Sequence, residues 1–208
     1  MAALVVHVPH ASLTIPDDAW PEFLVARAVV EAEALASADL YTHEMARQAW
    51  PTAKIVEAEV SRIVVDVERY DDDSKEEMAE VGRGVFYVCD HQMQPIRRAL
   101  SEIRRVELLD RYYRPHWERL RAQASDAILI DLHTYPSEPW PIERLAQGPR
   151  PEIDIGFSDG LTPLDWVEAL ADHFRQHGYD VGYNTPYVGV IDAGAKAATM
   201  IEIRRDIV

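Results

Sequence analysis

The chain has 208 residues, of which 48% are hydrophobic and 27% are charged, a composition that is ordinary for a soluble globular protein. That length suffices for one large domain with a substantial core. The formal net charge of −15 argues against a nucleic-acid partner, because phosphates require a basic surface. Cys89 is the single cysteine, which excludes an internal disulfide and a cysteine-rich zinc site.

The sequence also lacks the features that direct a protein into a membrane or out of the cell. Its N-terminus has neither the basic start nor the long apolar core of a secretion signal. No apolar run approaches the length of a membrane-spanning helix. We therefore expect a cytoplasmic protein with no membrane partner.

Patterns typical of strands and helices alternate along the chain. Short apolar runs predict strands at residues 3–8, 54–60, 63–67, 127–133, 153–157, 180–183 and 198–204. Longer amphipathic segments predict helices at residues 19–36, 40–50, 93–123 and 164–176, the third interrupted before Pro115. The alternation indicates one α/β domain, residues 1–208, with a mostly parallel sheet.

The strand predicted at residues 127–133 ends in polar side chains. A parallel strand delivers such side chains to the carboxyl edge of the sheet, where open α/β sheets bind ligands. Alternation along the strand puts Asp131 and His133 on the same face. That pattern is typical of a histidine that binds a metal through one ring nitrogen while a carboxylate orients it. The alternative is a core histidine that only ends the strand.

Other metal-ligand candidates lie earlier in the chain. Residues three apart in a strand face opposite sides, so His7 and His10 cannot both serve one site unless the chain turns at Pro9. His10 lies beyond the strand end and is the better candidate, and we expect His7 to be structural. Asp39 could cap the following helix or provide an oxygen ligand beside His10 and His133. From the residues alone, the helix cap is the commoner case.

Three arginines are candidates for binding a substrate carboxylate. Arg69 follows a predicted strand, and its planar guanidinium can hold both carboxylate oxygens, although a surface salt bridge is about as common. Arg62 precedes that strand, and Arg83 lies between two glycines in a tight loop. The proline-rich loop at residues 137–151 is of a kind that often forms the wall of a pocket.

The last strand contains a candidate catalytic carboxylate. Glu202 interrupts an apolar run, and a buried carboxylate is costly unless it is paired or used. The alternative is an edge-strand glutamate that faces water and pairs with Arg204. His116 lies within a predicted helix, where a packed or exposed histidine is commoner than a functional one.

Several stretches, taken together, resemble the N-formylglutamate amidohydrolase family. They are Val8-Pro-His-Ala-Ser12, Ala38-Asp39-Leu40, residues 61–69, Gly82-Arg-Gly84, Asp131-Leu-His133, Gly156 with Asp159-Gly160, Asn184-Thr-Pro186 and Ile201-Glu-Ile203. They are spread in order over nearly the whole chain, which is more specific than any single motif. The resemblance implies a fold similar to that of zinc carboxypeptidases, a mixed sheet flanked by helices, with one Zn²⁺ ion.

The resemblance also implies a role for each candidate residue. The implied zinc ligands are His10, Asp39 and His133. Glu202 would activate water, and Arg69 would hold a substrate carboxylate. The remaining substrate-binding candidates are Arg62, Arg83 and Asn184. The implied reaction is zinc-dependent hydrolysis of a C–N amide bond in a small N-acylated, carboxylate-bearing molecule such as N-formylglutamate.

Two departures from the family pattern bear on the identity of the substrate. Glu68 stands where the family's Asp-x-Asn-Arg pattern has asparagine, and Val188 and Val190 flank Gly189 where a glycine pair is usual. Two other functions fit the same residues. One is a zinc carboxypeptidase or amidase that acts on peptides, and the other is a non-catalytic metal-binding interaction protein.

Overall fold

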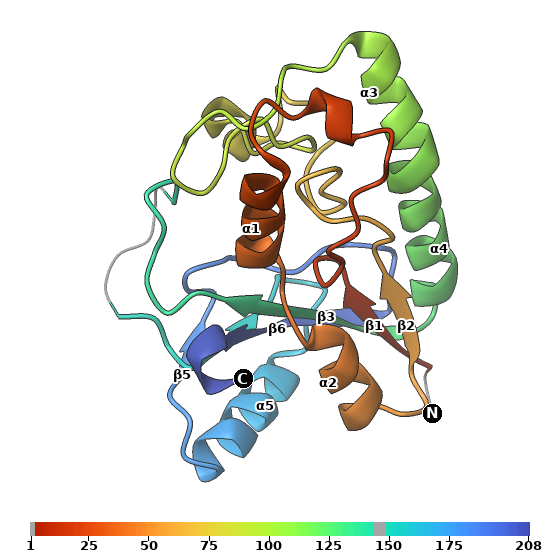
Figure 1. Ribbon diagram of the computed structural model, residues 1–208. Coiled ribbons are helices and arrows are strands. Elements are labelled where there is room, and N and C mark those ends of the chain that lie inside the picture. Colours follow the sequence, from red (N-terminus) through yellow and green to blue (C-terminus); the bar gives the residue numbers. More distant parts are fainter. Residues whose placement is uncertain (1–2, 144–148) are drawn as a thin grey trace.

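A computed structural model describes residues 3–143 and 149–208, and these residues form one six-stranded sheet with helices on both faces (Figure 1). The strands are β1 (Leu4–Val8), β2 (Lys54–Glu57), β3 (Ile128–Tyr135), β4 (Ile153–Gly156), β5 (Val181–Tyr183) and β6 (Ala197–Arg204). Their order is β2-β1-β3-β6-β4-β5, and only the pairing of β6 with β4 is antiparallel. The predicted mixed, mostly parallel sheet is confirmed.

The helices lie on the two sides of this sheet. They are α1 (Arg27–Ser37), α2 (Thr42–Ala49), α3 (Glu102–Leu108), α4 (Arg114–Ala124) and α5 (Leu164–Gln176), with short 3-10 helices at Trp20–Glu22, Glu77–Val81 and Arg205–Ile207. In Figure 1, α2 and α5 lie below the sheet and α1 lies above it. Among the described residues, no helix has the length and apolar character needed to span a membrane.

The alternation of side chains along the strands gives the sheet two different faces. One face is apolar and packs on α2 and α5, through Val6, Val8, Ile130, Leu132 and Ile201. The other face begins as an apolar surface under α4, formed by Val5, Leu129 and Ala198. Further along the same strands, this second face becomes polar, with His7, Asp131, His133 and Glu202. The polar part lies toward the carboxyl ends of β1, β3 and β6.

Residues 63–67 form no strand, contrary to the sequence prediction. Ile63 and Val64 are fully buried in a core shared with α1. Their backbone carbonyl oxygens accept hydrogen bonds from Arg97 Nη1, at 3.3 and 3.0 Å. Because a side chain satisfies these buried carbonyls, the segment needs no neighbouring strand. The apolar run predicts burial correctly, but it gives the wrong backbone conformation.

The long helix predicted at residues 93–123 begins later than expected. The first helical turn starts at Glu102, because the Ser101 side chain accepts a hydrogen bond from Arg104 N and caps α3. A π helix, Leu109–Tyr113, then joins α3 to α4. Pro115 lies in the first turn of α4, so the interruption expected before Pro115 is confirmed.

The helix predicted at residues 19–36 is also divided. Its first part is the 3-10 helix Trp20–Glu22, and α1 begins at Arg27 after an extended Ala26. The strand predicted at residues 54–60 ends at Glu57, because β2 lies at the sheet edge and pairs with β1 only that far.

We predict that the pair formed by Glu22 and Arg97 is essential to the fold. Arg97 is fully buried, and its Nε lies 3.0 Å from Glu22 Oε2. Glu22→Gln leaves the guanidinium buried without its counter-charge, so the free energy of unfolding should fall by about 3–5 kcal/mol. Urea denaturation measures this change. The control Glu31→Gln removes an exposed pair with Arg27 and should cost less than about 1 kcal/mol; equal losses would contradict the prediction.

Candidate active site

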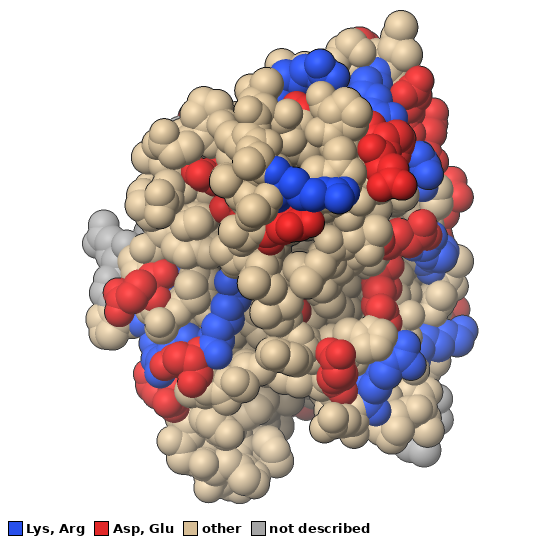
Figure 2. Space-filling view, viewed as in Figure 1, with Lys and Arg blue, Asp and Glu red and all other residues tan. Residues whose placement is uncertain are grey.

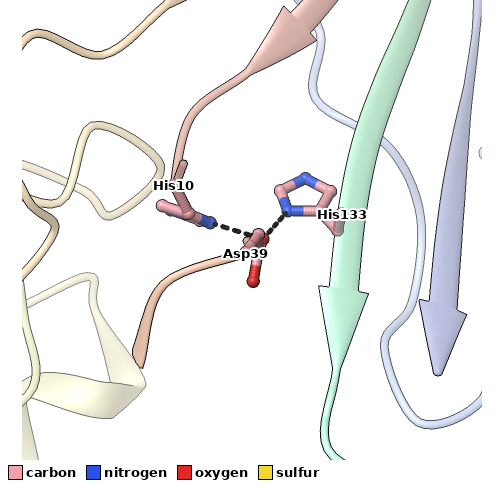
Figure 3. A group of neighbouring side chains, drawn as sticks. All are labelled: His10, Asp39 and His133. Carbon is pink, nitrogen blue, oxygen red and sulfur yellow. Dashed lines mark hydrogen bonds and ion pairs between the residues drawn. The ribbon is translucent and has the colours of Figure 1, made fainter. Parts of the chain in front are cut away.

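Three side chains from separate segments point toward one another at the polar part of the sheet (Figure 3). His10 follows β1, Asp39 lies between α1 and α2, and His133 lies on β3. Asp39 Oδ2 is 3.4 Å from His10 Nδ1 and 3.1 Å from His133 Nδ1. The backbone N–H of Asp39 donates to the carbonyl of His10 at 2.9 Å, which fixes the two loops together. All three side chains are buried.

Asp39 is not a helix cap in this fold. Residue 41 is the N-cap of α2 and makes no side-chain capping bond. The Asp39 carboxylate instead faces the two histidines and accepts a hydrogen bond from Arg205 Nη2 at 3.0 Å. Burial alone would raise the pKa of Asp39, but the close approach and charges of His10 and His133 hold that pKa well below its usual value. The carboxylate is therefore ionised at neutral pH.

Each of the two histidines is oriented by a carboxylate on its far nitrogen. Asp66 Oδ1 lies 2.9 Å from His10 Nε2, and Asp131 Oδ1 lies 3.0 Å from His133 Nε2. The predicted placement of Asp131 and His133 on one face is thus confirmed. His10 Nδ1 is buried and has no hydrogen-bond partner within the described residues. Two Nδ1 atoms and one carboxylate oxygen thus converge, a donor set that fits a divalent metal ion.

A second group of possible metal ligands, His7, Glu68 and Asp131, lies beside the first. In this group, His7 Nδ1 is hydrogen-bonded to Asp131 Oδ1 at 2.9 Å. The far nitrogen of His7 contacts His116 Nε2 at 2.8 Å. The group that includes His10 is therefore the better candidate metal site, since it alone of the two has a buried nitrogen with no hydrogen-bond partner among the described residues.

Asp66 is a site residue that the sequence analysis missed. Its Oδ2 accepts hydrogen bonds from Arg62 Nε, at 3.0 Å, and from the Tyr87 hydroxyl, at 2.7 Å. Burial alone would raise the pKa of Asp66, but the charges of Arg62 and His10 hold it well below its usual value. The available signal was a carboxylate within a buried apolar run, the same signal that singled out Glu202.

Glu202 lies in a central strand and is 5% exposed, so the edge-strand alternative is wrong. It is directly opposite His133 in the pairing of β6 with β3. Its Oε2 is buried and has no hydrogen-bond partner in the part of the chain that the structure describes. Burial raises the pKa of Glu202 to about 8, and the nearby Asp39 charge adds to this effect. Arg204 bonds Asp206 instead.

The three candidate arginines line one cavity of about 1100 Å³, which is also lined by His10, Asp39, His133 and Glu202. Arg83 is bonded to Glu33 and Ser37, at 3.0 and 2.8 Å. Arg62 is bonded to Asp66 through two of its nitrogens. In the described chain, the only ion pair of the Arg69 guanidinium is a 3.8 Å contact with Asp66. Arg69 is thus the arginine with the most capacity for a ligand.

The predicted wall of the pocket is present in part. Trp140, Ile142 and Glu143 line the cavity, and residues 144–148 of the predicted loop lie outside the described residues. Asn184 is not among the described lining residues. Its side-chain oxygen accepts hydrogen bonds from Phe157 N and Gly189 N, at 3.0 and 2.9 Å, so it holds a loop that lines the cavity. Figure 2 shows basic and acidic side chains interspersed on the viewed face, with no continuous basic surface there.

Comparisons with known proteins agree on one family. A sequence model of the N-formylglutamate amidohydrolases matches residues 2–208. An N-formylglutamate deformylase of Pseudomonas putida is 31% identical over 172 residues, which are 76% of this chain and 60% of that protein. The match therefore spans less than two thirds of that relative's length.

Two solved structures share the fold. A crystal structure of N-formylglutamate amidohydrolase from Ralstonia eutropha matches with a TM-score of 0.80 at 22% identity, covering 99% of this chain and 82% of that one. The structure of a gene product of Agrobacterium tumefaciens matches with a TM-score of 0.71 at 19% identity, and the match covers 99% of this chain and 81% of that one. At these identities the likeness concerns the fold.

We predict that Glu202 makes the metal-free protein less stable as the pH rises. Its pKa is about 8 in the folded chain, against 4.5 ordinarily, so between these values the folded state binds more protons than the unfolded state. Stability therefore falls with rising pH across this window, by roughly 2 kcal/mol between pH 6 and pH 8. Urea denaturation at several pH values measures this loss.

The comparison variant for this prediction is Glu202→Gln. Its side chain cannot titrate, so the loss of stability that Glu202 causes with rising pH should be absent. Asp154, whose pKa burial raises to about 7, titrates in the same window but is present in both proteins. The difference between the two pH profiles therefore isolates Glu202. A variant whose stability falls as steeply as that of the native chain would contradict the prediction.

Proposed function

The chain belongs to the N-formylglutamate amidohydrolase family, and we propose that it hydrolyses the C–N amide bond of a small N-acylated amino acid such as N-formylglutamate, using a bound zinc ion. The observation that carries the proposal is the convergence of His10, Asp39 and His133 at a cavity, with Glu202 on the adjacent strand. This arrangement provides metal ligands and an acid–base group at one place.

His10 Nδ1, His133 Nδ1 and Asp39 Oδ2 would hold the zinc ion. Two histidines and one carboxylate are a common ligand set of catalytic zinc, and the unpartnered His10 Nδ1 supports this assignment. When bound, zinc supplies Lewis-acid chemistry, because it polarises a carbonyl and makes water more acidic. The same ligands also suit non-haem iron, so metal analysis of the purified protein must measure both elements.

Glu202 is the proposed acid–base group. It would accept a proton from the attacking water and then donate that proton to the departing amine nitrogen. Its unpartnered Oε2 and its raised pKa suit a carboxyl group that takes up and returns a proton near neutral pH. Arg69 would bind the substrate carboxylate, because its guanidinium lines the cavity and is paired only loosely, at 3.8 Å from Asp66.

The cavity supports a second candidate substrate class. Its volume of about 1100 Å³ is slightly above the usual range for small-molecule sites, and an N-formyl amino acid would fill only part of it. Aromatic side chains line it as well, among them Tyr70, Tyr113, Trp117 and Trp140. A peptide or a larger N-acyl amino acid would use this space. Turnover of N-formyl, N-acetyl and peptide substrates, compared as kcat/KM, distinguishes these classes.

The first test of the proposal is Glu202→Gln. This variant keeps the size and polarity of the side chain but removes the base, so turnover should fall by roughly a hundredfold or more. Zinc should remain bound at about one ion per chain, because Glu202 is not assigned as a ligand. Metal analysis and steady-state kinetics measure the two effects.

The matched control is His133→Ala, which should lose tight zinc binding while the chain stays folded. Near-normal turnover in Glu202→Gln would make Glu202 structural. Loss of zinc from Glu202→Gln would instead make it a ligand. Absence of turnover on every amide by a native protein that retains zinc would favour the non-catalytic metal-binding function.

The second test is Arg69→Lys, which keeps the charge but loses the two-pronged contact with a carboxylate. We expect KM for carboxylate substrates to rise by roughly tenfold, with little change in kcat, because ground-state binding is lost. Arg119→Lys is the control, since Arg119 pairs with Glu59 on the surface. If Arg69→Lys and Arg119→Lys have the same kinetics, the substrate carboxylate is bound elsewhere.

A further inference from the structure

A line of hydrogen-bonded side chains runs from His133 into the interior, away from Asp39. His133 Nε2 lies 3.0 Å from Asp131 Oδ1, and the same oxygen lies 2.9 Å from His7 Nδ1. His7 Nε2 lies 2.8 Å from His116 Nε2. His7, His116 and Asp131 are each at most 1% exposed. Neither His7 nor His116 lines the cavity, so neither can touch a substrate there.

His7 occupies a position where packing alone would favour an apolar residue. It shares a strand face with Val5, which is fully buried under α4. A buried imidazole costs free energy unless its polar atoms are hydrogen-bonded. Both ring nitrogens of His7 have a partner, and burial lowers the pKa of His116 to about 3, so that its imidazole is neutral at neutral pH. Both ring nitrogens of His7 are therefore hydrogen-bonded, and the one that contacts the Asp131 carboxylate is Nδ1.

The two proposed metal-binding histidines are supported in the same way. His10 is oriented by Asp66, and Asp66 is itself held by Arg62 and Tyr87. His133 is oriented by Asp131, which needs a corresponding support. His7 is in place to provide it, because β1 and β3 are neighbours and residues 7 and 131 are paired in register.

We propose that His7 is a positioning residue that fixes the Asp131 carboxylate, so that His133 keeps its Nδ1 directed at Asp39 and His10. The proposal rests on the proposed metal site. Carboxylates that orient metal-binding histidines typically change metal affinity 10- to 100-fold when they are altered. Loss of His7 leaves Asp131 buried with one fewer hydrogen bond and free to rotate, so metal affinity should fall even though His7 touches no metal.

The test is the affinity for Zn²⁺, measured by competition with a chelator, in three variants of His7. His7→Leu removes both polar atoms and should weaken zinc binding by roughly 10- to 100-fold. His7→Asn places an amide N–H near the position of Nδ1 and should restore most of the affinity. His7→Gln places its amide near Nε2 instead and should bind zinc as weakly as His7→Leu. If His7→Leu does not fold, the difference in zinc affinity between His7→Asn and His7→Gln tests the proposal by itself.

Val5→Ala is the control for general damage to the core. Val5 is on the same strand and the same face as His7, so its truncation should lower the unfolding temperature without changing zinc affinity. The absorption spectrum of the Co²⁺-loaded protein gives a second readout. It should differ from the native spectrum in His7→Leu and His7→Gln, and match it in His7→Asn and Val5→Ala.

The outcomes separate this inference from the proposed function. A native protein that binds no metal overturns both. A native protein that binds one zinc ion, together with a His7→Leu or His7→Gln variant that binds it equally well, overturns only the role of His7. If the native chain binds two zinc ions and His7→Leu loses one of them, His7 is a ligand in the group with Glu68 and Asp131. That outcome would also overturn the positioning role of His7.

Discussion

The cost of burying charge is the constraint on which this site depends. Asp39, Asp66, Asp131 and Glu202 are all at most 5% exposed, and a buried carboxylate is destabilising unless a cation or a donor pairs with it. The three aspartates have such partners in the histidines and arginines around them. Among the described residues, Glu202 has one oxygen without a hydrogen-bond partner, and this is the oxygen that the proposed acid–base role would use.

The sheet places two of these groups, Asp131 on β3 and Glu202 on β6, whereas Asp39 and Asp66 come from the segments between the helices and strands. Residues on one face of β1, β3 and β6 are apolar under α4 and become polar toward the carboxyl ends of the strands. His133 and Glu202 are therefore neighbours by register, and the polar residues meet the loop that follows β1. Arg97 holds the buried segment that precedes Asp66, because it donates hydrogen bonds to the carbonyls of Ile63 and Val64.

Local patterns in the sequence predicted much of this arrangement. Strand alternation placed Asp131 beside His133, and the isolated carboxylate in an apolar run singled out Glu202, because both signals depend only on residues close together in the sequence. The same reasoning missed Asp66, whose segment is buried without being a strand. It also could not connect His7 to His116, because that contact joins β1 to α4 across 109 residues. Nor could it show that Asn184 holds a loop of the cavity wall, because the hydrogen bonds of its side chain to Phe157 N and Gly189 N depend on the fold.

The central claim is that His10, Asp39 and His133 form one metal site at the cavity. The most direct test is anomalous X-ray diffraction at the zinc edge, from crystals of protein purified with zinc. The account predicts one anomalous peak about 2.0–2.2 Å from the Nδ1 atoms of His10 and His133 and from a carboxylate oxygen of Asp39. A peak only among His7, Glu68 and Asp131, or no peak in crystals of the zinc-loaded protein, would contradict it.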